Sequence, residues 1–181
     1  IPKTQSIEKK ETLKKLGAEL IEVDAVPYKN PKNYIRQSKQ IAEELNKKNS
    51  NGVYWANQFD NMSNLEAHVQ STAEEIWNQT AGTVDGFTCA VGTGGTLAGV
   101  SIGLKNKNKN IKIALSDPMG SALFSHVKND KLESSGNSIT EGIGNGRITK
   151  NYDKALIDEA FQTDDVEALN LVYDLIEKQK I

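Results

Sequence analysis

Between residues 86 and 104, a strand pattern is followed by three glycines in four positions and then by a helix pattern. The glycines stand in the stretch Gly92-Thr93-Gly94-Gly95-Thr96. Because glycine lacks a Cβ, such a turn can take positive φ angles and bring its backbone close to a ligand. Its N–H groups and those that open the helix form a site for an anion, usually a phosphate, to which two threonine hydroxyls can add donors. This feature predicts a strand–turn–helix unit with an anion site.

Helix and strand patterns alternate along the rest of the chain. We expect helices over residues 6–16, about 31–45, 63–77, 96–104 and 121–127, and strands over 19–23, 53–55, 86–91 and 111–116. A polar, glycine-rich loop is expected at 128–151, and a helix, a strand and a last helix opened by Asp164, Asp165 and Glu167 follow it. This alternation predicts an α/β architecture with a mainly parallel sheet, whose ligand-binding loops lie at one edge.

Start and stop signals accompany several of these helices. Ser6 and Gly17 are the expected first cap and stop of the first helix, and Pro31 suits the first turn of the second. Ser63 and Glu66 have the spacing of a capping box, which predicts that the third helix begins at Ser63.

The glycine turn can be separated from two common phosphate loops. A Walker A loop ends in Gly-Lys-Ser/Thr, but no Lys or Arg occurs between Asn49 and Leu104. A dinucleotide-binding loop needs a third glycine where Leu97 stands. Asp117, at the end of the next expected strand, lies where a ribose-binding acid could be, so nicotinamide binding stays open. A tight turn without a ligand is the other alternative.

Two further segments are candidates for a site. The stretch from Glu141 to Arg147 has glycine at every second position, which indicates close backbone approach or a flexible surface loop, and Arg147 could pair with a carboxylate or a phosphate. The stretch from Asn57 to Asn61 follows an expected strand. Its amide side chains could bind a polar substrate, although asparagine and aspartate also favour turns.

Composition limits the partners. The chain has 181 residues and a net charge of −2, spread evenly over its two halves, which gives no basic face for nucleic acid. No apolar run is long enough for a membrane span. The single cysteine, Cys89, allows no internal disulfide and is expected to be a buried structural thiol. No metal site is expected, and His68 is assigned a surface or core role. A cytoplasmic protein is the default expectation.

Taken together, these segments resemble the cysteine synthase (O-acetylserine sulfhydrylase) family of fold-type-II pyridoxal-phosphate enzymes. The landmarks cover nearly the whole chain: Ser6–Lys10 with Leu16–Glu19, Asn57–Asn61 with Asn64, Glu75–Trp77, Val91–Thr96 with Gly99, Asp117–Ser121, and Glu141–Thr149. The resemblance implies a three-layer α/β fold like that of the tryptophan synthase β subunit, with a mainly parallel sheet and helices on both faces.

The family also implies a cofactor, a reaction and site residues. Pyridoxal 5'-phosphate would be the cofactor, and sulfide would replace the acetyl group of O-acetylserine to give L-cysteine and acetate. Gly92, Thr93, Gly94, Gly95 and Thr96 would hold the cofactor phosphate. Gln58, Gly142 and Ile143 would hold the substrate or line its cleft. A homodimer is implied, with serine acetyltransferase as a further possible partner.

The chain departs from the family at the catalytic centre. In the family the Schiff-base lysine and the loop that grips the substrate carboxylate precede the position of Ile1, and a serine at the pyridine nitrogen follows that of Ile181. We therefore expect a central piece that is inactive by itself, with part of a small mobile domain over 1–62 and part of a large cofactor-binding domain over 63–181.

Other functions stay open beside cysteine synthesis. Cystathionine β-synthase-like and serine/threonine dehydratase-like enzymes share the phosphate loop, although Gln58 and the segment 141–149 favour cysteine synthase. A nicotinamide-binding oxidoreductase and a non-catalytic phosphate-binding protein that has lost the lysine are the alternatives from other classes.

Overall fold

The computed structural model describes residues 1–180 and divides the chain into two compact units, Ile1–Asn57 and Gln58–Ile181. Ile181, the last residue of the expected domain range 63–181, lies outside the described residues. The boundary between the units falls just before Gln58, because the residues after the boundary form hydrogen bonds within the second unit. The Asn151 amide, for example, donates to the Phe59 carbonyl at 2.8 Å. Across residues 1–180, every helix is too short or too polar to cross a lipid bilayer.

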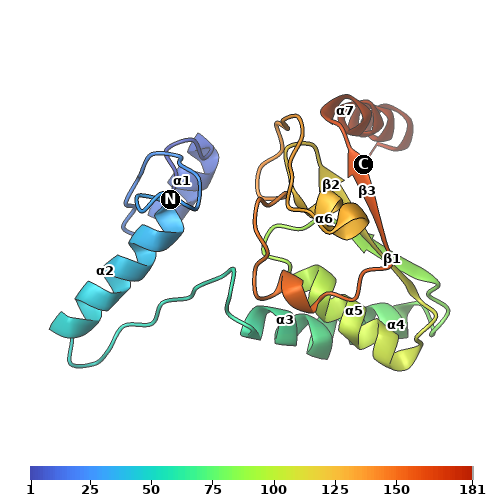
Figure 1. Ribbon diagram of the computed structural model, residues 1–181, viewed down its shortest axis with the longest axis horizontal. Coiled ribbons are helices and arrows are strands. Elements are labelled where there is room, and N and C mark those ends of the chain that lie inside the picture. The colour runs from blue at the N-terminus through green and yellow to red at the C-terminus, as the bar shows by residue number, and fades with distance from the viewer. Residues whose placement is uncertain (181) are drawn as a thin grey trace. The chain divides into compact units, whose positions relative to one another are not determined.

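The first unit contains two helices, α1 (Ile7–Lys15) and α2 (Tyr34–Lys48) (Figure 1). Gly17, in the left-handed region at φ +85°, follows the end of α1 as expected. The expected start of α2 is wrong. Asn33 is its N-cap and accepts a hydrogen bond from the Ile35 N–H at 3.0 Å, so Pro31 lies before the helix. An amide oxygen satisfies a free N–H group at the helix start, which proline cannot do.

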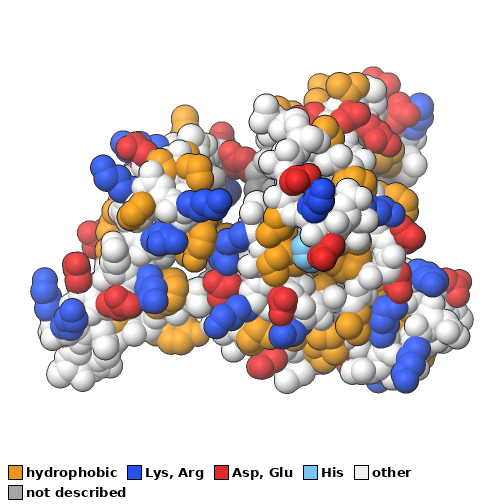
Figure 2. Space-filling model, viewed as in Figure 1, with side chains coloured by type: hydrophobic (Ala, Val, Ile, Leu, Met, Phe, Trp, Pro, Cys, Tyr) orange, Lys and Arg blue, Asp and Glu red, His pale blue; other side chains and the backbone are white. Residues whose placement is uncertain are grey.

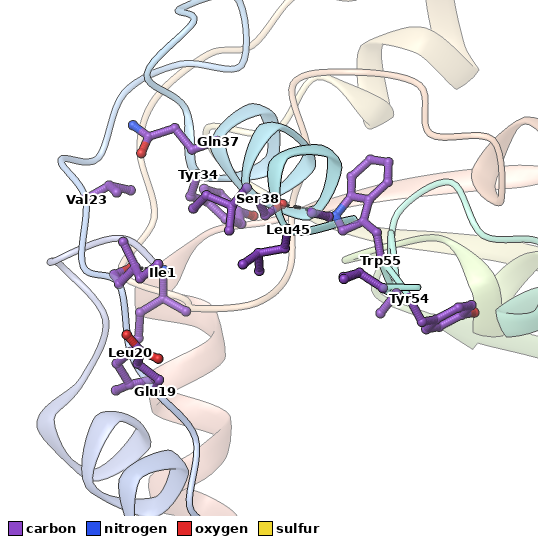
Figure 3. A pocket seen from close by; sticks show the side chains of 15 residues that line it. Ile1, Glu19, Leu20, Val23, Tyr34, Gln37, Ser38, Leu45, Tyr54 and Trp55 are labelled. Atoms are coloured by element: carbon purple, nitrogen blue, oxygen red, sulfur yellow. Dashed lines mark hydrogen bonds between the residues drawn. The ribbon is translucent and has the colours of Figure 1, made fainter. Parts of the chain in front are cut away.

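The two strands expected in this unit, at 19–23 and 53–55, do not form. Apart from a single bridge between Pro2 and Val23, these segments have no strand partner in residues 1–180. A strand needs a neighbouring backbone to satisfy its N–H and C=O groups, and sequence patterns alone do not supply one. The two segments instead line a cavity of about 330 Å³ together with α2, where the Trp55 indole N–H donates to the Ser38 hydroxyl at 3.1 Å (Figure 3).

The second unit opens with a helical stretch that has three parts. They are α3 (Ser63–Ala67), the π-helical turn η1 (His68–Thr72) and α4 (Ala73–Gln79). Helix α3 begins at Ser63 as predicted, but the predicted capping box is wrong, because the Ser63 side chain caps nothing. The Asn61 side chain accepts the hydrogen bond from the Ser63 N–H instead, at 3.1 Å.

A parallel sheet forms the centre of this unit, in the order β1 (Gly86–Cys89), β2 (Lys112–Pro118) and β3 (Glu159–Thr163). Between the strands lie α5 (Gly95–Lys107), α6 (Leu123–Asn129) and the short η2 (Tyr152–Lys154), and α7 (Asp165–Asp174) with η3 (Leu175–Gln179) follows β3 (Figure 1). The α/β class and the parallel sheet are confirmed. The Asp164 carboxylate caps α7 through the Glu167 N–H at 2.9 Å.

The core lies between α5 and one face of the sheet. Leu97, Val100 and Leu104 of α5 pack with Ile113 and Leu115 of β2, and all five side chains are fully buried. On the other face of the sheet, Phe161 of β3 is 59% exposed. Helix α5 also packs closely against η1 and α4, because it has glycine at the contact positions: a Cβ on Gly99 would lie 2.5 Å from His68 Cβ of η1, and a Cβ on Gly103 would overlap Ala73 Cβ of α4. This packing fixes the N-terminus of α5 at the sheet edge.

Candidate functional site

The glycine turn connects β1 to α5, as predicted. Gly94 is the N-cap of α5 and takes a left-handed conformation at φ +89°. Each glycine also meets another part of the protein. A Cβ would overlap the Gly142 carbonyl at Gly92 and the Asn64 side chain at Gly95, and at Gly94 it would lie 2.6–2.7 Å from Tyr152. The glycines are therefore required for close packing around the turn, in addition to any ligand.

The start of α5 keeps unsatisfied donors. Of the first four N–H groups, that of Gly95 reaches the Thr93 hydroxyl at 3.3 Å and that of Ala98 reaches the Gly94 carbonyl at 3.0 Å. Within residues 1–180, no hydrogen bond satisfies the N–H groups of Thr96 and Leu97. Such groups, at the positive end of a 13-residue helix, attract an anion. The turn therefore fits a phosphate group.

Both threonines of the turn are held by neighbours. The Thr93 hydroxyl accepts from the Asn64 amide at 2.9 Å and from the Gly95 N–H, which leaves its own proton free to donate to an anion. The Thr96 hydroxyl lies 3.1 Å from His68 Nε2, and His68 Nδ1 lies 2.8 Å from the Thr72 hydroxyl. No sequence pattern indicated this contact of His68 with Thr96. Its position at the start of the π-helical turn η1 brings its ring to the glycine turn.

The segment from Glu141 to Arg147 lies against the same turn. The Gly144 N–H donates to the Val91 carbonyl at 2.8 Å, and the Asn145 amide donates to the Gly92 carbonyl at 3.1 Å. The structure thus brings Gly142 and Ile143 to the glycine turn. Gly142, at φ +85°, has open space where its Cβ would be. Ile143 is 38% exposed and lines a polar cavity of about 260 Å³ with Ser121, Ser138, Thr140 and other residues.

Gln58 is connected to the turn through Asn64. The Asn64 amide that contacts the Thr93 hydroxyl also lies 3.5 Å from the Gln58 carbonyl, which is a long hydrogen bond. Arg147 pairs with a carboxylate, one of its two predicted partners: its guanidinium nitrogens lie 3.2 and 3.3 Å from the Asp60 oxygens. The three candidate segments of the sequence therefore meet at one place in the second unit.

Asp117 does not take the position of a ribose-binding acid. It is 1% exposed, and its Oδ2 accepts from the Phe124 N–H at 2.7 Å at the start of α6. Burial raises the pKa of this carboxyl group above its ordinary value, and the hydrogen bonds from Phe124, Ser121 and Leu123 oppose that effect only in part. The carboxylate therefore faces the protein interior and is not available to a ribose. Asp117 was the residue on which the nicotinamide alternative depended, so the structure does not support that alternative.

The turn itself has no ionisable side chain, and no lysine or arginine lies between Asn49 and Leu104. Burial raises the pKa of Cys89, near the end of β1, to about 11, so this thiol stays protonated at neutral pH. On the face that Figure 2 shows, basic and acidic side chains are interspersed. Within the turn itself, only N–H and hydroxyl groups are available to hold an anion.

The fold and the site define a class. A family profile described as "Pyridoxal-phosphate dependent enzyme" matches residues 1–181, and the chain belongs to this family. More particularly, the chain is 45% identical over 99% of its length to cysteine synthase 1 of Neurospora crassa and 39% identical over 97% to cysteine synthase of Dictyostelium discoideum. It covers 48% of each of these relatives, so the chain spans about half their length.

Solved structures agree with this assignment. O-acetyl serine sulfhydrylase isoform 3 from Entamoeba histolytica matches with a TM-score of 0.79 and 35% identity, over 100% of this chain and 50% of that one. A hydrogen sulfide-producing enzyme from Fusobacterium nucleatum matches with a TM-score of 0.78 and 31% identity, over 100% of this chain and 57% of that one. The resemblance to the cysteine synthase family and the α/β fold of this class are confirmed.

Proposed function

We propose that the whole protein is a pyridoxal-phosphate-dependent cysteine synthase, which replaces the acetyl group of O-acetylserine by sulfide and forms L-cysteine and acetate. The observation that carries this proposal is the glycine turn itself. It has unsatisfied N–H groups at a helix N-terminus and belongs to a chain that matches cysteine synthases over nearly its whole length. In such an enzyme the bound cofactor withdraws electrons from the substrate, and the protein supplies orientation and proton transfer.

The residues of the turn have separate tasks in this proposal. The backbone N–H groups of Gly92, Thr93, Gly94, Gly95 and Thr96, with the free proton of the Thr93 hydroxyl, hold the cofactor phosphate. No lysine or arginine stands within the turn or in the helix that precedes β1. The phosphate is therefore held by directional donors, which fix its orientation as well as its position.

The substrate side of the site is assigned to Gln58, Gly142 and Ile143. Their support is that the segments carrying them meet at the phosphate turn, and that Gly142 leaves open space beside it. We further propose that residues 1–62 belong to a small mobile domain and 63–181 to the large domain. We also propose that the whole protein is a homodimer, that it forms a complex with serine acetyltransferase and that it is cytoplasmic.

The experiment compares three reactions of the purified whole protein supplied with pyridoxal 5'-phosphate. We expect L-cysteine from O-acetylserine and sulfide, and much slower condensation of serine with homocysteine and dehydration of threonine. Residues 1–181 alone are expected to form no cysteine, because the Schiff-base lysine of the family has no counterpart in this stretch. Faster dehydration than cysteine formation would move the protein to the dehydratases, and activity of residues 1–181 alone would contradict the assignment of the lysine elsewhere.

Replacing Gln58 by alanine in the whole protein tests the substrate site. We expect kcat/KM for O-acetylserine to fall on the order of 100-fold, since a mispositioned substrate loses much of the benefit of orientation. The amount of bound cofactor, measured by absorbance, should be unchanged. The matched control is Gln79→Ala at the end of α4, which should leave both values unchanged. Equal kinetics for Q58A and wild type would remove Gln58 from the site.

A further inference from the structure

Asp60 and Arg147 form an ion pair between two segments that are 87 residues apart in the sequence. Two guanidinium nitrogens face the two carboxylate oxygens at 3.3 and 3.2 Å, and the side chains are only 17% and 19% exposed. A forked pair of this kind fixes the distance and the orientation of both partners. It differs from the pair of Lys128 with Glu159, whose side chains are 40% and 56% exposed.

Further bonds hold the same two segments together. The Lys150 N–H donates to Asp60 Oδ1 at 2.9 Å, and the fully buried Asn151 donates to the Phe59 carbonyl at 2.8 Å. The Arg147 guanidinium also lies over the Phe59 ring, 5.4 Å from its centre. Burial alone would raise the pKa of Asp60, but the bonds from Lys150 and Arg147 outweigh it and lower the pKa below its ordinary value. Asp60 is therefore ionised at neutral pH.

Each of these segments is also attached to the phosphate turn. Thr149, two residues after Arg147, donates from its hydroxyl to the Thr93 carbonyl at 2.6 Å. Asn64, four residues after Asp60, donates to the Thr93 hydroxyl at 2.9 Å. The ion pair therefore completes a ring of contacts. The turn is bonded to Thr149, the nearby Arg147 is bonded to Asp60, and Asn64 of the same segment is bonded back to the turn. Gln58, two residues before Asp60, is attached to this ring through its carbonyl, which lies 3.5 Å from the Asn64 amide.

We propose that Asp60 and Arg147 are positioning residues: their pair sets where Gln58 lies relative to the phosphate turn and thereby sets the affinity for the amino-acid substrate. This inference rests on the proposed function, which assigns Gln58 to that substrate. The pair acts through Gln58. A pair that served only the stability of the fold would change the melting temperature and leave the substrate affinity as it is.

The test uses the whole protein with pyridoxal 5'-phosphate bound. Arg147→Met removes the charge and keeps the length of the side chain, Asp60→Asn removes the other charge, and the double exchange Asp60→Arg with Arg147→Asp restores a pair of reversed polarity. Lys128→Met is the matched control at the exposed pair. For each variant we would measure KM for O-acetylserine, kcat, bound cofactor, and hydrogen exchange of the Ser63 and Asn64 amides, which are hydrogen-bonded to Asn61 in the segment that carries Gln58.

We expect R147M and D60N to raise KM for O-acetylserine about tenfold or more, with little change in kcat and full cofactor content. Amide exchange at Ser63 and Asn64 should be faster in both variants, and the double exchange should recover part of the lost affinity. K128M should behave as wild type. A lower melting temperature with unchanged KM and unchanged exchange at these amides would overturn the proposal.

The exchange measurement also separates this inference from the proposed function. If wild type forms no cysteine, the proposed function fails, while faster exchange at Ser63 and Asn64 in R147M would still show that the pair holds the segment that carries Gln58. If wild type forms cysteine and R147M has the wild-type KM, the proposed function stands and the positioning role is refuted.

Discussion

Replacing Gly94 by alanine is expected to lower the free energy of unfolding by about 3 kcal/mol or more. The left-handed conformation at φ +89° is unfavourable for any residue with a Cβ, by about 1–2 kcal/mol. The new Cβ would also lie 2.6–2.7 Å from the Cβ, Cα and backbone N of Tyr152, and overpacking of this kind adds about 1–3 kcal/mol. Backbone atoms cannot rotate away, so the turn or η2 must shift. Urea unfolding followed by circular dichroism measures the loss.

Gly136→Ala is the matched control for this result. Gly136 is also left-handed, at φ +69°, but the nearest atom to its Cβ would be Met119 Cε, the end of a flexible side chain, at 2.8 Å. We expect a loss of about 1–2 kcal/mol at Gly136, from backbone strain alone. Equal losses of stability at the two positions would show that the contact with Tyr152 does not contribute to the effect at Gly94. The structure directs a side chain at Gly94 toward Tyr152.

Replacing Thr96 by aspartate is expected to have opposite effects on the fold and on the cofactor. A carboxylate in the first turn of α5 favours the helix by about 0.3–1 kcal/mol, and it can accept a hydrogen bond from His68 when Nε2, which lies 3.1 Å from the Thr96 hydroxyl, carries the proton. The same carboxylate repels a phosphate at the turn, and like charges brought together cost several kcal/mol. We therefore expect unchanged or higher stability and at least a 100-fold weaker affinity for pyridoxal 5'-phosphate. Equilibrium dialysis of the whole protein and thermal unfolding give the two values.

The neutral variant Thr96→Asn is the control for the charge. It has nearly the same shape as T96D and lacks the negative charge, so most of the cofactor affinity should remain. If T96D binds pyridoxal 5'-phosphate as tightly as T96N, the phosphate does not lie at this turn. A loss of stability in T96D would contradict the assignment of Thr96 to the positive end of α5.

Local patterns predicted the second unit well and the first unit poorly. β1, α5 and β2 were predicted because each has its own signal: an apolar strand, a glycine turn and a helix pattern, in order. The segments 19–23 and 53–55 have equally good strand patterns, but within the described chain they meet no continuous backbone partner. The predictions for the starts of α2 and α3 were wrong in part for a related reason. Helix α2 begins after Pro31, with Asn33 as its cap, and at the start of α3 the Asn61 side chain accepts a hydrogen bond where the Ser63 side chain was expected to do so, since the choice between neighbouring residues depends on the incoming backbone.

The sequence predicted which segments form the candidate site, but it did not predict which of their side chains are in contact. The turn, the stretch around Gln58 and the stretch around Gly142 stood out by their glycines and amides, and the fold brings them together. The contact of His68 with Thr96 and the contact of Asn64 with both Gln58 and Thr93 could not be read from spacing. They depend on how α3 and η1 pack along α5, which is set by small residues such as Gly99.

The most direct test of the central claim is a crystal structure of the whole protein with pyridoxal 5'-phosphate bound. We expect phosphate oxygens within about 2.7–3.2 Å of the N–H groups of Thr96 and of at least two other residues of the stretch 92–95, with the Thr93 hydroxyl as a further donor. A phosphate held by lysine or arginine side chains away from this turn would contradict the account, even if the protein makes cysteine.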